Sequence, residues 1–432
     1  MRVSHKSPKI FFGWWTVLAC GIIGFLGLGF GNLGFSSMFK PLSEDLGLDR
    51  AATSIAAGIG SVMGGLAGPL AGWANDRYGP RRVMLVGLMV LVTGFISMFF
   101  INSLIAFLFV WGVVVGLGTT LGPAIMTDRA IVNWFVHKSG MAVNIKFAIQ
   151  ALSGILLLPL IAFMVTNHGW RITYIIAGII VLVVTIPLTW FFVRPHRPEY
   201  YGLLPDGVTR TQETFQKGIK RNAKIIEPEL VEFTFRQTIR TSAYWLVIVI
   251  AWVSGFSFPM MNAHFIPFLT DKGIGPIQAA SMMGMISVVN IPARLIAGFI
   301  ADRINSGQLR YIIAAGVLLQ ACGTAAYLVG RNMAGIYTWI VFYGVGFGVT
   351  QSALFPLIVR YFGRKSFGSI TGLNSMLMMP VGLLAPIYIG WVYDTTGAYT
   401  RIIGLMTGLL MTAGIIACFI RRPRLHVESS TA

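Results

Sequence analysis

The sequence predicts an all-α membrane protein, with twelve transmembrane helices in two six-helix pseudo-symmetric halves. Three observations predict this class: apolar runs long enough to cross a bilayer, an uneven distribution of Lys and Arg, and an internal repeat. The chain has 432 residues, of which 55% are hydrophobic and 11% are charged, and its mean hydropathy is +0.74. A soluble domain carries about 25% charged residues. The composition therefore excludes an ordinary soluble enzyme, a disordered protein and a secreted disulfide scaffold.

Apolar runs recur along the whole chain, and a run of about 18 residues marks a bilayer-crossing helix. The expected spans are 12–34, 52–74, 82–100, 103–126, 139–164, 172–193, 243–268, 278–300, 311–329, 334–358, 366–392 and 402–420. One long polar interval separates the sixth span from the seventh. We therefore expect a first half at 1–193, a central loop at 194–242, and a second half with a short tail at 243–432.

The basic residues predict the orientation of these spans. If both termini and the central loop share one side, that side holds 25 of the 33 Lys and Arg residues. The other side holds only Lys40, Arg50, Arg171, Lys272, Arg331 and Arg401. This asymmetry follows the positive-inside rule and predicts that both termini are cytoplasmic. The net charge of +18 therefore reports topology and does not indicate a nucleic-acid partner.

The two halves repeat each other in sequence. Residues 41–47 follow the first expected span, and the similar residues 267–273 follow the seventh. The same offset carries residues 72–77, after the second span, onto residues 298–303, after the eighth. Duplicated bundles of this kind are typical of transporters that bind their substrate between the repeats, near the middle of the membrane.

Residues 72–82 (GWANDRYGPRR) resemble the loop 2–3 motif of the major facilitator superfamily, and residues 298–303 resemble its shorter second copy. Four further stretches resemble the bacterial monocarboxylate-transporter-like and oxalate/formate-antiporter-like group: 12–15, 197–207, 264–273 and 390–399. The resemblance implies a secondary transporter of small organic anions in a bacterial inner membrane. The loop motif implies a set of residues that lock a conformation and do not contact substrate. These residues are Asp76, Arg77, Arg81, Asp302 and Arg303.

Two basic residues fall inside the expected spans, Lys146 and Arg294, and by these boundaries no acidic residue does. Asp128 is placed at the cytoplasmic end of the fourth span. Each intramembrane cation costs about 2.5–3.5 kcal/mol, so a pair without acidic partners suggests a bound anion. The resemblance implies that helices five and eight are neighbours across the two halves. We expect Arg294 to bind a carboxylate through its planar fork and Lys146 to act as the second cation, which favours a dianion or a monoanion plus a second anionic group.

The sequence departs from the group at the positions that couple transport. Proton-coupled members carry an aspartate four residues before the helix-eight arginine, whereas this chain has Asn290, whose amide takes up no proton at physiological pH. The lysine of the antiporter group in helix eleven is also absent, since residues 374–376 read Asn-Ser-Met. His264 is the remaining titratable candidate, either for a polar interface or gate or for a proton relay.

The resemblance also implies that spans one, four, seven and ten line the cavity. The hydrogen-bonding candidates there, together with Asn290, are Asn262, Tyr343, Gln351 and Thr119. Packing between helices is the alternative for Asn262, Tyr343, Gln351 and Thr119. The three cysteines lie far apart without ligand spacing, and residues 29–34 match a dinucleotide fingerprint by letters only. We therefore expect a monomer in the lipid bilayer that is not an enzyme and that has no cofactor, metal or nucleic-acid partner.

The sequence thus predicts a carrier of small mono- or dicarboxylates that works by alternating access, possessing an anion site at Arg294 and Lys146. One alternative keeps the fold and couples the transport of lactate-like monocarboxylates to a proton, which is carried by His264 or by the substrate. The coupled partner can also be a counter-anion that is exchanged for the substrate. A second alternative is a membrane sensor that has lost transport, but a central loop of this size is too small for a signalling domain.

Overall fold

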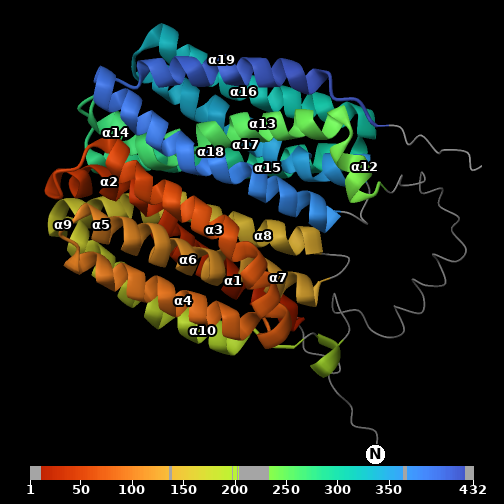
Figure 1. The fold of residues 1–432 in the computed structure, drawn as a ribbon, viewed down its shortest axis with the longest axis horizontal. Coiled ribbons are helices and arrows are strands. Elements are labelled where there is room, and N and C mark those ends of the chain that lie inside the picture. Colours follow the sequence, from red (N-terminus) through yellow and green to blue (C-terminus); the bar gives the residue numbers. More distant parts are fainter. Residues whose placement is uncertain are drawn as a thin grey trace, which may run out of the picture.

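The computed structural model describes residues 11–135, 139–196, 198–201, 203, 233–362 and 367–423. This described part of the chain is helical throughout, with no β-strand. Figure 1 shows two bundles side by side, one coloured red to yellow-green and the other green to blue. The predicted fold class is confirmed.

The first bundle contains helices that are interrupted by π-helical turns. Its α-helices are α1 (Phe12–Leu28), α2 (Gly34–Asp45), α3 (Arg50–Tyr78), α4 (Pro80–Ser97), α5 (Leu104–Phe107), α6 (Gly116–Thr119), α7 (Ile125–Trp134), α8 (Ser139–Leu152), α9 (Leu158–Ile180) and α10 (Ile186–Phe192). The π-helical turns are Gly29–Leu33, Leu108–Val115, Thr120–Ala124, Ser153–Leu157 and Val181–Thr185. Short 3-10 turns occupy Met98–Phe100 and Pro198–Tyr201.

The second bundle has longer uninterrupted helices. They are α12 (Phe235–Ile239), α13 (Ser242–Pro259), α14 (Phe265–Thr270), α15 (Pro276–Arg303), α16 (Leu309–Gly330), α17 (Met333–Phe362), α18 (Phe367–Thr396) and α19 (Thr400–Cys418). A π-helical turn, Met260–His264, joins α13 to α14, and a 3-10 turn at Ser306–Gln308 precedes α16.

Eleven helical segments in the described chain are long and apolar enough to cross a membrane. One of them, Met141–Phe192, has 52 residues, whereas about 20 residues cross a bilayer. Gly169 interrupts it with φ 78° and ψ 162°, which are not helical angles. The segment therefore crosses twice, and twelve crossings result. The predicted end of the first span at residue 34 was too early, because the helix continues through a π-helical turn to Asp45.

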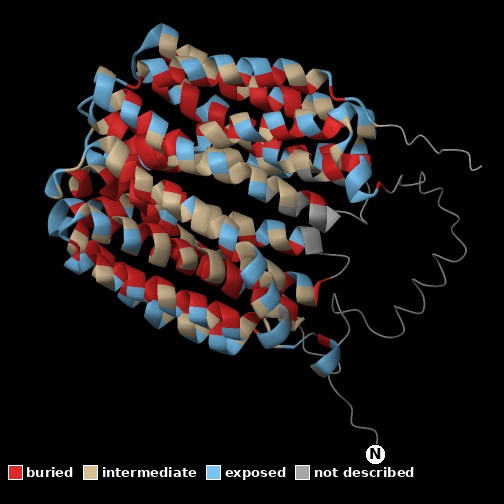
Figure 2. Ribbon diagram, viewed as in Figure 1, coloured by how far each residue is buried: buried red, intermediate tan, exposed pale blue. Residues whose placement is uncertain are grey.

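We call the end of the bundle where α1 begins and α19 stops the terminal end, and the opposite end the far end; they lie at the right and left of Figure 1. Each half has its own hydrophobic core, which Figure 2 shows in red, with exposed residues around the outside. Large apolar side chains on that outside, such as Val329 and Ile105, are 88% and 80% exposed, as expected for surfaces that face lipid.

Glycines bring the halves into close contact over their far-end portion. A Cβ at Gly284 of α15 would lie 2.3 Å from the carbonyl oxygen of Gly154, and a Cβ at Gly390 of α18 would lie 2.7 Å from the backbone of Arg50. Nearer the middle, a Cβ at Gly65 of α3 would meet Met379. One turn further, a Cβ at Gly68 would lie within 4 Å of Ile125 of its own half, counting described residues alone. The halves pack tightly at the far end, and the ribbons in Figure 1 diverge toward the terminal end.

Candidate transport site

A cavity of about 750 Å³ lies between the halves, near the middle of the helices. Both halves supply its wall, and no described residue of the wall carries a formal charge. Its polar residues are Asn32, Ser61, Thr119, Thr120, Ser254, Asn262, Gln351 and Asn374. Its aromatic residues are Phe35, Trp111, Phe258 and Phe347. The wall can thus hold an apolar body and donate or accept several hydrogen bonds, but it offers no counter-charge.

Three of the predicted lining residues, Thr119, Asn262 and Gln351, lie on this wall. Thr119 already donates to Val115 and Gly116 in its own helix, and Asn262 donates to Phe258 at 3.2 Å. Thr119 and Asn262 thus have helix partners, which leaves the side chain of Gln351 as the most available of the three. Their contact with substrate stays a prediction.

Two polar groups of the wall have no hydrogen-bond partner among the described residues: the hydroxyl of Ser254 and Oδ1 of Asn374. Buried polar atoms are rarely left unpaired, so these two atoms could bind a ligand after a change of rotamer that exposes them to the cavity. Neither residue was predicted as a ligand from the sequence. Asn374 lies in the stretch where the antiporter group has a lysine. That difference was the sequence signal that could have identified Asn374 as a candidate ligand.

Two other predicted lining residues lie behind the wall. Tyr343 is 2% exposed, its hydroxyl lies 3.1 Å from that of Ser257, and its ring stacks on Phe347. Asn290 donates to the backbone carbonyl of Gly344 at 3.1 Å. In this conformation both side chains link helices, which was the alternative considered for Tyr343.

Lys146 has an acidic partner, contrary to the expectation. Its Nζ lies 2.9 Å from Oδ1 of Asp128, and the lysine side chain is 1% exposed. The expectation failed because the fourth span was ended too early: α7 continues to Trp134, which puts Asp128 six residues, or about 9 Å, inside the helix end. The buried ammonium is therefore paired, as the cost of burying a charge requires.

Arg294 has no such partner. It lies in α15 and makes no hydrogen bond or ion pair with the described residues; its guanidinium Cζ lies 5.0 Å from the ring centroid of Phe147 in α8. Lys146 approaches the same ring, with Nζ 4.1 Å from the centroid. The fifth and eighth predicted spans, which correspond to α8 and α15, are therefore neighbours, as expected. Phe147 contacts both cations. Neither cation lines the central cavity as the structure stands.

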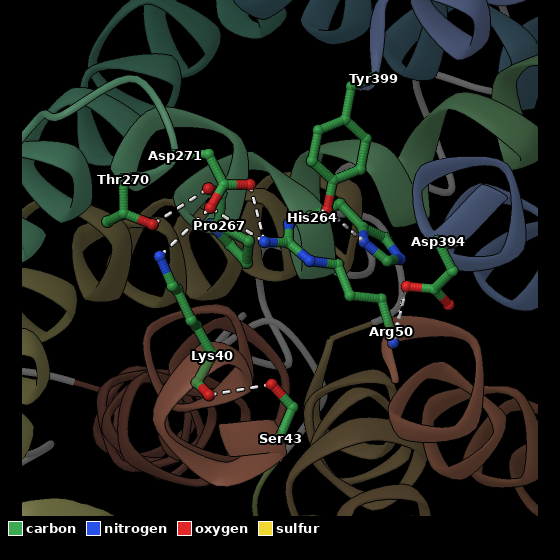
Figure 3. Close-up of polar contacts among 9 residues, drawn as sticks. All are labelled: Lys40, Ser43, Arg50, His264, Pro267, Thr270, Asp271, Asp394 and Tyr399. Carbon is green, nitrogen blue, oxygen red and sulfur yellow. Dashed lines mark hydrogen bonds and ion pairs between the residues drawn. The ribbon is translucent and has the colours of Figure 1, made fainter. Parts of the chain in front are cut away.

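The far end is closed by charged and polar side chains from both halves, drawn in Figure 3 except for Ser54. We call this group the far-end seal; it consists of Lys40, Arg50, Ser54, His264, Asp271, Asp394 and Tyr399. Asp271 lies 3.2 Å from Nζ of Lys40 and 2.7 Å from the guanidinium of Arg50. Asp394 accepts from the backbone N–H of Arg50 at 3.1 Å, at the N-terminus of α3, where a carboxylate is favoured.

His264 lies inside this seal and is fully buried. The hydroxyl of Tyr399 accepts from Arg50 at 2.5 Å and lies 3.1 Å from Nδ1 of His264. Burial raises the pKa of Tyr399, so its hydroxyl keeps a proton that it can donate to Nδ1. Nε2 then carries the ring proton. The Nε2 atom lies 3.3 Å from the carbonyl oxygen of Pro386 and 3.2 Å from the hydroxyl oxygen of Ser54. Because both nitrogens have partners, the geometry favours the interface role over the proton relay.

Among the residues whose side chains the structure describes, the seal and its neighbours supply the hydrogen bonds and ion pairs that join the two halves, and these lie at the far end. Seven such bonds involve residues 36–54 of the first half and residues 263–271, 394 and 399 of the second. The seal therefore holds the far side of the cavity shut in this conformation.

In the variant Arg50→Gln, we expect the far end to open more often, because the shorter uncharged amide loses its contacts in the seal. Charge-assisted hydrogen bonds contribute about 1.5–3 kcal/mol each, so labelling of a cysteine placed at Ser54 should rise about tenfold or more. The measurement uses an impermeant maleimide, with the three natural cysteines replaced by alanine. Lys272→Gln is the control, since the contacts of this ammonium with described residues are those with the rings of Phe268 and Tyr327. Equal labelling of the two variants would contradict the role of Arg50.

The residues predicted to lock a conformation lie at the terminal end. The side chains of Asp76 and Asp302 lie outside the described residues. The guanidinium Cζ of Arg81 lies 4.0 Å from the ring centroid of Trp190, and that of Arg303 lies 3.2 Å from the ring centroid of Phe299. Arg77 lies near the rings of Trp73 and Tyr78. These are contacts within each half, and the locking role stays a prediction.

Comparisons with known proteins agree with this architecture. The family model described as Major Facilitator Superfamily matches residues 17–386. Monocarboxylate transporter 2 of Rattus norvegicus is 23% identical over 411 residues, which cover 93% of this chain and 82% of the relative. The probable sulfoacetate transporter SauU of Cupriavidus necator is 24% identical over 375 residues, covering 83% and 82%. The crystal structure of a D-xylose-proton symporter covers 95% of this chain and 99% of its own with a TM-score of 0.69. Its 14% identity shows the fold alone.

Proposed function

The chain belongs to the Major Facilitator Superfamily, and from that premise we propose that it carries organic anions across a membrane by alternating access. Arg294 binds the carboxylate of the substrate, and the uncharged central cavity receives the rest of the molecule. Both termini are cytoplasmic, as the distribution of basic residues predicts, so the cavity faces the cytoplasm when the far-end seal is closed.

The observation that carries this proposal is the state of Arg294. A guanidinium inside a membrane helix is costly unless it is paired or serves a function. Arg294 contacts a ring of the opposite half and has no carboxylate or hydrogen-bond acceptor among the described residues. Its planar fork suits a carboxylate, which would neutralise it at the interface where the two halves must move.

The charges near this site favour a monoanion. Asp128 neutralises Lys146, so Arg294 supplies the net positive charge at the level of Phe147. The earlier preference for a dianion depended on two unpaired cations and loses that support. Relatives named as monocarboxylate and probable sulfoacetate transporters support an organic anion as the substrate class.

The cavity supports a substrate body with polar groups. Its volume of about 750 Å³ exceeds what a three-carbon acid fills. The unpartnered atoms of Ser254 and Asn374, on α13 and α18, can bind hydroxyl or carbonyl groups of that body. The aromatic pair Phe258 and Phe347, with ring centroids 6.2 Å apart, forms an apolar surface beside them.

Uptake into proteoliposomes tests the proposal. We expect saturable uptake of at least one labelled monoanion among lactate, pyruvate, benzoate and acetate, and slower uptake of the dianions oxalate and sulfoacetate. Uptake of xylose should equal that of protein-free liposomes. The proposal is overturned if xylose is transported and the anions are not, or if no anion exceeds the protein-free rate.

A further inference from the structure

The two side chains of the ion pair between Lys146 and Asp128 differ in their exposure to solvent. The lysine side chain is 1% exposed, whereas that of Asp128 is 41% exposed. A proton from solution can therefore reach the carboxylate while the ammonium stays enclosed. Protonating Asp128 would leave a buried ammonium without its counter-charge, which is unfavourable unless another anion takes that place.

The groups around Asp128 define what its protonation would change. α7 packs against α1, α3, α4 and α8. The titratable group that α1 brings close to both charges is Cys20, and α8 brings Lys146. Arg129, the neighbour of Asp128 in α7, points toward Gly72 of α3.

The other charged residues of these helices have contacts elsewhere or are exposed. Arg81 of α4 stacks on Trp190, Arg77 of α3 lies near Trp73, and Arg82 is exposed. Asp76, also of α3, has its side chain outside the described residues. Lys146 is therefore the direct ion-pair partner of Asp128, and Arg294 of the other half approaches the same Phe147 ring as Lys146.

We propose that Asp128 is the proton-coupling residue of this transporter, and that its protonation frees Lys146 to join Arg294 in binding the substrate anion. The inference rests on the proposed function. In the empty site, Asp128 is ionised and paired with Lys146. In the loaded site, Asp128 carries one proton, and the substrate carboxylate binds between Lys146 and Arg294.

The charge balance of this exchange fixes the stoichiometry. The empty site contains two cations and one carboxylate, with a net charge of +1. The loaded site contains two cations, one neutral carboxylic acid and one monoanion, and again has a net charge of +1. The site therefore moves one proton with each monoanion, and the returning empty carrier has the same charge as the loaded one. This assignment also explains why an amide can stand at position 290, where proton-coupled members of the group carry an aspartate. The acid that couples the proton lies in the other half.

The first experiment separates coupling from binding. Proteoliposomes containing the wild type, Asp128→Asn or Asp128→Glu are tested for lactate uptake under an inward proton gradient and for exchange against preloaded lactate at equal pH. For Asp128→Asn we expect at least a tenfold loss of gradient-driven uptake with exchange retained, and for Asp128→Glu partial recovery of gradient-driven uptake. Asp45→Asn is the matched control, because Asp45 pairs with Arg171 within the same half, away from Lys146, and it should keep both activities.

A second variant guards against misfolding. In Asp128→Asn a buried ammonium loses its counter-charge, whereas Asp128→Asn combined with Lys146→Gln removes both charges. The double variant should fold and should exchange anions without stimulation by a proton gradient, but more slowly than Asp128→Asn, because Lys146 no longer binds the anion. Gradient-driven uptake at the wild-type rate in either variant overturns the inference and leaves the proposed function intact.

A measurement without transport tests the same residue even if lactate is not carried. Infrared difference spectra of the purified protein on acidification should show a carboxylic-acid band that is missing in Asp128→Asn and present in Asp45→Asn. Identical bands in wild type and Asp128→Asn would mean that Asp128 takes up no proton, and would overturn the inference. Absence of uptake of every anion by the wild type instead refutes the proposed function.

Discussion

The variant Arg294→Gln is expected to lose anion transport by a factor of about 100 or more. A bidentate guanidinium–carboxylate contact supplies two charge-assisted hydrogen bonds of about 1.5–3 kcal/mol each, and each 1.4 kcal/mol is tenfold in affinity. Glutamine fits the same space but presents no charge to the substrate. The measurement is exchange of labelled against unlabelled lactate in proteoliposomes at equal pH, which needs no coupling ion.

Two further variants, Arg294→Lys and Arg401→Gln, test the same prediction. Arg294→Lys keeps the charge and loses the planar fork, so we expect an intermediate loss. Arg401→Gln, at an exposed position at the start of α19, should exchange lactate at the wild-type rate. Wild-type exchange by Arg294→Gln would mean that the substrate carboxylate binds elsewhere.

The variant Gly284→Leu is expected to prevent closure of the far end and to reduce transport more than tenfold. A Cβ at this position would lie 2.3 Å from the carbonyl oxygen of Gly154. That atom belongs to the backbone of the opposite half, so it cannot move aside as a side-chain tip does. The halves must separate there, and a cysteine placed at Ser54 in the far-end seal should then react with an impermeant maleimide in most molecules.

Gly404→Leu is the control for this prediction. Gly404 lies in α19, and a Cβ there would meet no described atom within 4 Å. We expect this variant to keep both the transport rate and the low labelling of the wild type. Low labelling of Gly284→Leu with normal transport would show that the Gly154–Gly284 contact is not needed for closure.

The fold could be predicted from the sequence because each span is defined locally, by its length and hydropathy. Met141–Phe192 illustrates this: polar residues near Gly169 separated the two predicted spans, although the helical run in the structure is nearly continuous across that glycine. The ion pair of Lys146 could not be predicted in the same way. It depends on where α7 ends, and a difference of a few residues decides whether Asp128 lies in a loop or inside the membrane.

The far-end seal depends on contacts between distant parts of the sequence. Arg50 and Asp394 are 344 positions apart, and no local pattern pairs them. A signal was nevertheless present, since His264 and Asp271 lie in one stretch that carried the family resemblance and Asp394 and Tyr399 lie in another. The resemblance identified these stretches, and only the structure showed that they meet.

The central claim is that Arg294 binds the carboxylate of an organic anion. Ligand-dependent thermal stabilisation of the purified protein tests it most directly, because a ligand at 100 times its dissociation constant stabilises the folded state by about 2.7 kcal/mol whether or not transport is coupled. We predict that lactate, pyruvate or benzoate raises the unfolding temperature of the wild type and of Arg401→Gln but leaves that of Arg294→Gln unchanged. Equal stabilisation of all three proteins by the same anion would contradict the claim.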